Sequence, residues 1–437
     1  MDETQPRGSG GRGWGVGSPA VRILAGLGLG LAIGGIGAAT GWRLEGALAV
    51  AGAVGGIWLD ALKMTIVPLV FSLVVTGIAA AAASAGAGGV TRGAFLLFTV
   101  LLLGSAVTAA LLGPLLLGAW SPPAMDALRA GIAPGELPAV PPPGEWLRGL
   151  VPSNVVSSAA AGAIVPLTLF ALLFGLAAAR LPEERGQAVL GFFAAVAETM
   201  LVIVRWVLLL APIGVFALAF GVAARVGLGA GAALAWYVTV QIVVTLILGL
   251  AMYPLAILAG RVKPLAFARA AAPAQAVAAS TQSSLASLPL MLAGAERLGL
   301  SARVPSVMLP LAVALFRIAA PASIVIVTLT LARMTGVELG IGQVAIVVLM
   351  ATLNTLVIAG LPNQITFFAA YAPPAIAVGL PIELLPLFLA IDTIPDIFYT
   401  VSNVTADLAV TSVAAAGAPN GAASPDAPEE KGPPLDQ

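Results

Sequence analysis

The chain has 437 residues, of which 59% are hydrophobic and 9% are charged, and its 20 basic residues balance its 20 acidic ones. This composition is that of an integral membrane protein, and the zero net charge gives no sign of a nucleic-acid partner. The chain has no cysteine and no histidine, which excludes thiolate chemistry and a histidine triad or proton relay. With no nucleophile–base pair or metal cluster in the sequence, we do not expect an enzyme.

Long apolar runs follow a polar, glycine-rich stretch at residues 1–20, which does not read as a cleavable signal. The runs are continuous rather than alternating, so they predict transmembrane helices and not barrel strands. We expect an all-α membrane protein with eight spans at about 21–42, 48–80, 94–118, 157–179, 188–221, 231–259, 304–333 and 381–414. Residues 119–156 are expected to form an outer loop, and 1–20 and 415–437 disordered cytoplasmic tails.

Two further apolar segments, at about 265–297 and 342–376, are interrupted at their middles by STQSSLASLP and IAGLPNQ. Each half is too short to cross the bilayer, so we expect two re-entrant helical hairpins, an arrangement typical of transporters built from inverted repeats. The domains expected are a six-span region at 21–260 and a transport core at 261–414. Lys and Arg concentrate in the segments that lie inside when the N-terminus is cytoplasmic, which predicts a plasma (inner) membrane protein with both termini in the cytoplasm.

The last span carries a polar stripe in LAIDTIPDIFYTVSNVTADLAV. At about 100° per helical residue, four polar side chains fall within roughly 60° of one another. Carboxylates in a bilayer are costly unless they face a polar cavity, a partner or an ion. We therefore expect a site that handles something hydrophilic, although a buried network that only packs helices together is the alternative. The stripe comprises Asp392, Asp396, Asn403 and Asp407, with Tyr399 and Thr400 at its edges.

Four segments, in the expected order, resemble the dicarboxylate/amino acid:cation symporters, the glutamate transporter homologues. They are LDALKMTIVPLVFSLVVTGIA (59–79), TQSSLASLPLML (281–292), AGLP (359–362) and DTIPDIFYTVSNVTADL (392–408). The resemblance extends over nearly all of residues 21–414. It implies a glutamate-transporter-like fold and a homotrimer. Each subunit would have a static scaffold and a mobile domain that carries the substrate across the membrane by an elevator-type mechanism.

The resemblance also implies roles for individual residues. Asp396 would pair with a substrate amino group, Thr400 and Asn403 would surround its α-carboxylate, and Asp392 and Asp407 would lie in or near sodium sites. The hairpin tips would contribute Ser283, Ser284, Gly360 and Pro362. The serines could instead be small helix-packing residues, and Gly360 and Pro362 could simply break a helix.

Two departures from the family pattern bear on substrate and coupling. Tyr399 stands where carriers of acidic amino acids have an arginine, and a phenol cannot form a bidentate cationic fork. The substrate preference is therefore expected to shift from acidic to neutral amino acids, with Tyr399 either a ligand or a pocket wall. The family's Asn-Met-Asp-Gly-Thr sodium motif is replaced by Phe316-Arg317-Ile318-Ala319-Ala320. The third span near Leu103-Gly104 lacks the family's hydroxyls as well. Since sodium needs several oxygen ligands, coupling to several sodium ions is not expected.

Arg317 lies near the middle of its predicted span, beyond the reach of snorkelling. It should pair with Asp392, Asp396 or Asp407, where it could take the electrostatic role of a missing sodium ion, contact an anionic substrate, or form a purely structural ion pair. We expect a secondary transporter of a small amino acid or related organic anion, working in the lipid bilayer without a cofactor. Protons, exchange or one residual sodium ion remain open as the coupling. The alternative is a receptor-like or anion-conducting relative that has lost transport.

Overall fold

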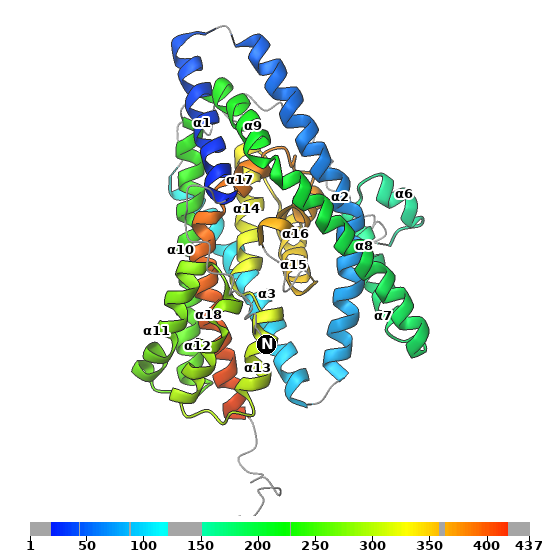
Figure 1. Cartoon of the computed structure of the whole chain (residues 1–437), viewed down its shortest axis with the longest axis vertical. Helices are drawn as coiled ribbons and strands as arrows, with labels where there is room; N and C mark the ends of the chain where they lie inside the picture. The colour runs from blue at the N-terminus through cyan, green and yellow to red at the C-terminus, as the bar shows by residue number, and fades with distance from the viewer. Residues whose placement is uncertain are drawn as a thin grey trace, which may run out of the picture.

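The computed structural model describes residues 19–42, 44–86, 89–120, 151–227, 229–357 and 363–417, and this part of the chain is helical, with no strand. The helices pack into two groups that lie side by side (Figure 1). The polar stripe belongs to the second group. Predicted Gly360 and Pro362, most of the 119–156 loop and most of both tails lie outside the described residues.

The first group is organised by α2, the longest described helix, which packs against three other members of the group, while α1 lies along α9. Its helices are α1 (Pro19–Thr40), α2 (Glu45–Gly86), α7 (Ile164–Ala178), α8 (Glu183–Leu209) and α9 (Ala211–Val226), and the short α6 (Val155–Ala160) leads into α7.

The contact between α1 and α9 depends on glycine. Three glycines spaced four residues apart on α1 face backbone carbonyl oxygens of α9, so close that a Cβ atom would lie 2.4–2.6 Å from them. Small residues at this spacing allow two membrane helices to approach backbone to backbone. The glycines are Gly26, Gly30 and Gly34, which face Pro212, Phe216 and Phe220.

The second group surrounds α18 and α14. Helix α18 packs against α10, α11, α12 and α13, while α14 packs against α3, α10, α15 and α16. Its helices are α3 (Gly89–Ala119), α10 (Gly229–Leu258), α11 (Pro264–Thr281), α12 (Ser284–Arg297), α13 (Pro305–Leu315), α14 (Ala319–Thr335), α15 (Ile341–Val357), α16 (Asn363–Ala377), α17 (Leu385–Ile391) and α18 (Thr393–Gly417).

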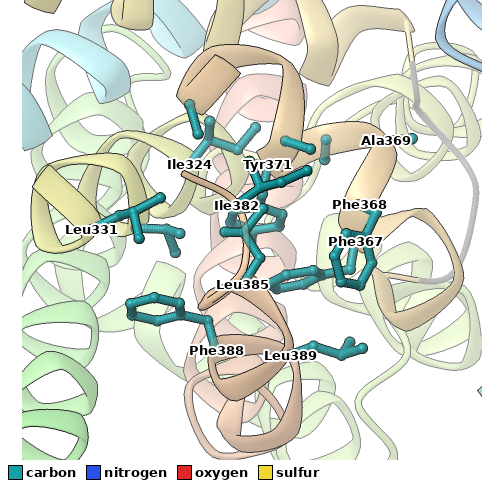
Figure 2. Packing of buried hydrophobic residues seen from close by; sticks show 14 of the residues in the cluster. Ile324, Leu331, Phe367, Phe368, Ala369, Tyr371, Ile382, Leu385, Phe388 and Leu389 are labelled. Atoms are coloured by element: carbon teal, nitrogen blue, oxygen red, sulfur yellow. The ribbon is translucent and has the colours of Figure 1, made fainter. Parts of the chain in front are cut away.

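An apolar cluster fixes α14, α16 and α17 against one another. Figure 2 shows side chains from all three helices, with Leu331 of α14 and Phe388 of α17 on one side, Phe367 and Phe368 of α16 on the other, and Ile382 and Leu385 between them. Phe367 and Tyr371 of α16 stack with ring centroids 4.2 Å apart. Because α14 is buried almost along its whole length, its hydroxyl-bearing side chains, such as Ser323 at 0% exposure, have no access to lipid or water.

The spans differ in part from the eight predicted. Six described helices are long and apolar enough to cross a membrane, and α17 with α18, bent by 66°, would make a seventh. Predicted span 157–179 is divided into α6 and the 15-residue α7 at Gly162, whose φ is +66°. Predicted span 188–221 is divided at Leu210, since α9 begins at Ala211 with Pro212 in its first turn. The interrupted segments 265–297 and 342–376 are each a pair of short helices, α11–α12 and α15–α16.

One ion pair joins the two groups. Lys63 on α2 donates to Glu383, just before α17, over 2.8 Å, and the two side chains are 33% and 55% exposed. It connects residues 320 positions apart.

Candidate functional site

The seventh predicted span is broken at its centre. Helix α13 ends at Leu315, Phe316 has an extended backbone (φ −111°, ψ 103°), and α14 begins at Ala319. The break has a local cause in Pro321, because a proline ring clashes with the carbonyl group four residues before it, here that of Arg317. Arg317 is thus presented from an irregular segment, and not from a continuous helix as expected.

Two side chains from other helices satisfy the backbone groups of this break. Ser105 of α3 donates its hydroxyl to the carbonyl oxygen of Ile318 over 2.5 Å. Asn403 of α18 accepts the N–H of Ala319 on its Oδ1 over 3.0 Å. Asn403, predicted from the resemblance to contact substrate, therefore has its oxygen committed to α14, and only its Nδ2 can donate to a substrate carboxylate.

The break places Arg317 near the stripe. The half-buried Arg317 interacts electrostatically with the carboxyl groups of Asp392, Asp396 and Asp407. Asp392 and Asp407 are 1% and 0% exposed, whereas Asp396 is half-buried. Neither carboxyl oxygen of Asp407 has a hydrogen-bond donor within the described part of the chain. A charged group or bound ligand is therefore needed to compensate this carboxylate when it is ionised.

The stripe begins at a second broken helix. Asp392 terminates α17, and the 66° bend precedes Pro395 in the first turn of α18. Gln282, between α11 and α12, adopts a left-handed backbone (φ +52°) and donates its side-chain amide to the carbonyl oxygen of Thr393 over 2.7 Å. The turn between the two short helices is thereby attached to the bend beside Asp392.

The predicted residues of this turn have mainly local contacts. Ser283 caps α12, accepting the N–H of Ala286 on its hydroxyl over 3.2 Å, and Ser284 is the first residue of that helix. Thr400, which lies on α18 and not in this turn, also has a local contact: it is 5% exposed and donates its hydroxyl to the backbone oxygen of Asp396 over 2.8 Å.

Tyr399 belongs to a buried polar cluster that the sequence did not reveal. The hydroxyl of Ser323 lies 2.7 Å from that of Tyr371 and donates to that of Tyr399 over 3.0 Å. It also accepts the side-chain amide of Gln241 over 3.1 Å, and this amide lies 3.1 Å from the hydroxyl of Tyr237. Three of the four tyrosines in the chain meet here. Polar residues such as Gln241 and Ser323 within apolar spans are the signal that could have indicated the cluster.

A cavity of about 20 Å³, room for roughly one water molecule, separates Arg317 from the α15–α16 pair. Its lining comprises Arg317, Ala320, Ile324, Asn354, Thr355, Thr366, Ala370 and Tyr371. Tyr399 does not belong to this lining.

Aromatic packing fills the place of the altered sodium motif. Phe316 stacks on Phe98 of α3 with ring centroids 4.8 Å apart and planes at 14°, and both side chains are fully buried. Ile318 is also buried, at 1% exposure. These side chains carry no oxygen that could coordinate a cation.

Buried carboxylates, two spans interrupted by helix breaks and two pairs of short helices define a multi-span membrane protein with a charged site in its interior. The chain belongs to the sodium:dicarboxylate symporter family, which its residues 20–416 match. The members of this family are transporters and not enzymes.

Relatives of this chain have several substrates in their names. This chain is 27% identical to the proton/glutamate-aspartate symporter of Escherichia coli (strain K12), in an alignment that covers 82% of this chain and 84% of the relative. It is 26% identical to a C4-dicarboxylate transport protein of Azorhizobium caulinodans (90% and 87%). It is 29% identical to neutral amino acid transporter B(0) of Oryctolagus cuniculus (89% and 77%).

Proposed function

We propose that this protein is a secondary active transporter of a small amino acid or related organic anion. The observation that supports this most directly is the charged site itself, in which Arg317 interacts with three aspartates in the interior of a membrane protein. The named substrates of the relatives, which include acidic and neutral amino acids and C4-dicarboxylates, agree with this chemistry.

Asp396 is the proposed partner of a substrate amino group. It is the most exposed of the three carboxylates of the stripe, and an ammonium group in a dry site needs such a counter-charge. The α-carboxylate would lie between Thr400 and the Nδ2 of Asn403. The turn at Ser283–Ser284 would close the site from one side, and Gly360 and Pro362, which the resemblance assigns to the second hairpin tip, are proposed to contact the substrate as well.

The two groups of helices suggest how the site moves. In an elevator mechanism, α1, α2 and α7–α9 would form the static scaffold, and the α18-centred group would carry the site across the membrane. The protein would be a homotrimer in the plasma (inner) membrane, with both termini in the cytoplasm.

The coupling ion is proposed to be a proton, or transport to be obligatory exchange, because Phe316 and Ile318 replace sodium ligands. Arg317 would neutralise one carboxylate throughout the cycle, since a guanidinium stays protonated at physiological pH.

The test is substrate uptake into proteoliposomes with sodium replaced by choline, with and without an imposed pH gradient. We expect uptake to persist in choline and to respond to the pH gradient or to substrate loaded inside. A steep, saturable sodium requirement would show that backbone carbonyl groups suffice to bind sodium and would contradict the coupling proposal.

A relative that conducts anions or only binds its ligand is the second candidate, favoured by the Phe98–Phe316 stack in place of a sodium motif. A counterflow assay distinguishes the proposed transporter from this alternative. Substrate-dependent exchange of label supports a carrier, whereas current without saturable uptake supports the alternative.

A further inference from the structure

The buried cluster around Ser323 occupies the hydroxyl of Tyr399. This hydroxyl accepts a hydrogen bond from Ser323 over 3.0 Å and is also hydrogen-bonded to the hydroxyl of Tyr237. All three side chains are buried. A phenol offers one proton and, as a rule, one accepting position, so these two bonds use both. The hydroxyl of Tyr399 then has no hydrogen bond left to offer a substrate.

Ser323 fixes the direction of the bond that Tyr399 receives. A serine hydroxyl has one proton and two lone pairs. Ser323 gives its proton to Tyr399 and accepts the side-chain amide of Gln241 over 3.1 Å. Its remaining bond, over 2.7 Å to Tyr371, therefore uses the proton of Tyr371. Because every position on the Ser323 oxygen is occupied, its proton stays directed at Tyr399.

The part of Tyr399 that can face the polar stripe is its ring. Tyr399 lies three residues after Asp396 and four before Asn403, a spacing that places all three on one face of α18. These two neighbours are the proposed partners of the amino and carboxylate groups of the substrate. The aromatic ring between them is an apolar surface. A polar side chain placed against it would give up its hydrogen bonds to water without replacement.

We propose that Ser323 is a positioning residue that makes Tyr399 an apolar wall of the substrate site, so that the substrate is a neutral amino acid with an apolar side chain. This inference rests on the proposed transport function and names its substrate class. Leucine and asparagine are the probes. Their side chains have the same branched arrangement of heavy atoms, but one ends in two methyl groups and the other in an amide.

The first measurement needs no substrate and follows the apparent Tm of the purified protein in detergent. Ser323→Ala and Tyr399→Phe remove the same hydrogen bond, so the double variant should lose less than the sum of the two single losses. The control is Thr328→Val, which removes a buried hydroxyl of the same helix that donates to its own backbone. Combined with Tyr399→Phe, this control should be additive. Additivity in the Ser323–Tyr399 pair would overturn the assignment of the hydroxyl.

The second measurement is the ratio of the dissociation constants for asparagine and leucine, obtained by calorimetry. Wild type should prefer leucine, and Tyr399→Phe should keep the same ratio whatever its affinities. Ser323→Ala leaves the Tyr399 oxygen without the proton that it accepted, and the amide of asparagine can supply one. The ratio should then shift toward asparagine by roughly 2- to 10-fold. Ser323→Thr, which keeps a hydroxyl, should restore the wild-type ratio.

The double variant Ser323→Ala/Tyr399→Phe separates positioning from a structural effect. The shift toward asparagine should vanish in it, and Thr328→Val should produce no shift. A shift that persists in the double variant would overturn the positioning role of Ser323. Binding of asparagine without leucine by wild type would overturn the apolar wall and leave the transport proposal standing, whereas binding of neither would count against both.

Discussion

The close approach of α1 and α9 allows a paired prediction from two glycines on one helix. A Cβ atom added to Gly30 would lie 2.6 Å from the backbone oxygen of Phe216 and 2.9 Å from the Cβ of Ala219. A Cβ atom added to Gly28 meets nothing within 4 Å. Gly30→Ala and Gly28→Ala thus make the same chemical change, one against a neighbouring backbone and the other in open space.

The expected free energies follow from these contacts. Carbon–oxygen contacts between packed helices are ordinarily about 3.3–3.6 Å, so α9 would have to withdraw from Gly30→Ala by roughly 0.7–1 Å. Such overpacking costs about 1–3 kcal/mol, while replacing glycine by alanine in a helix returns about 0.5–1 kcal/mol. Gly30→Ala should be destabilised by about 1 kcal/mol, within a span of about 0–2.5 kcal/mol, and Gly28→Ala should gain stability of about 0.5–1 kcal/mol.

The measurement is the apparent Tm in detergent, followed by intrinsic tryptophan fluorescence. In a chain of this length 1 kcal/mol corresponds to about 2 °C or less, so the two variants should move in opposite directions by a few degrees at most. Equal shifts of the same sign would show that α1 and α9 are not in backbone contact, and the reasoning would fail.

Three further predictions concern the site. Asp396→Asn should abolish calorimetric binding of an amino acid substrate, whereas near-normal affinity would mean that the substrate has no amino group or that Asp396 serves only as a partner of Arg317. Asn403→Ala leaves the N–H of Ala319 without its acceptor and should lower the free energy of unfolding by about 1–3 kcal/mol, seen as a reduced Tm; an unchanged Tm would contradict the capping role. Gln282→Ala should speed proteolysis at the α11–α12 turn, or labelling of a single cysteine introduced there, since the bond to Thr393 is lost; identical rates with and without the Gln282 substitution would show that this bond does not hold the turn.

The parts of the fold that could be predicted are those that local sequence determines. The interrupted segments predicted both pairs of short helices. Helical spacing predicted that Asp396 and Asp407 share one face of α18, but it does not apply to Asp392, which ends α17 before the 66° bend. The polar stripe needed no knowledge of neighbouring helices, because carboxylates in an apolar run are informative by themselves.

The two helix breaks differ from the sequence prediction although their cause is local. Pro321 and Pro395 each follow an irregular segment, but the continuous apolar length of each span predicts an unbroken helix. The pairing of Ser105 with Ile318 and of Asn403 with Ala319 could not be predicted, because it joins helices far apart in sequence. The same applies to the cluster at Ser323, whose members come from α10, α14, α16 and α18.

The ion pair between Lys63 and Glu383 has a consequence for any relative movement of the two helix groups. It is partly exposed, and such pairs contribute at most about 1 kcal/mol, so thermal energy breaks and remakes it readily. A contact this weak can report which arrangement the subunit has adopted without trapping it there. Because the chain has no cysteine of its own, cysteines introduced at these two positions would give a reversible marker of that arrangement on an otherwise unreactive background.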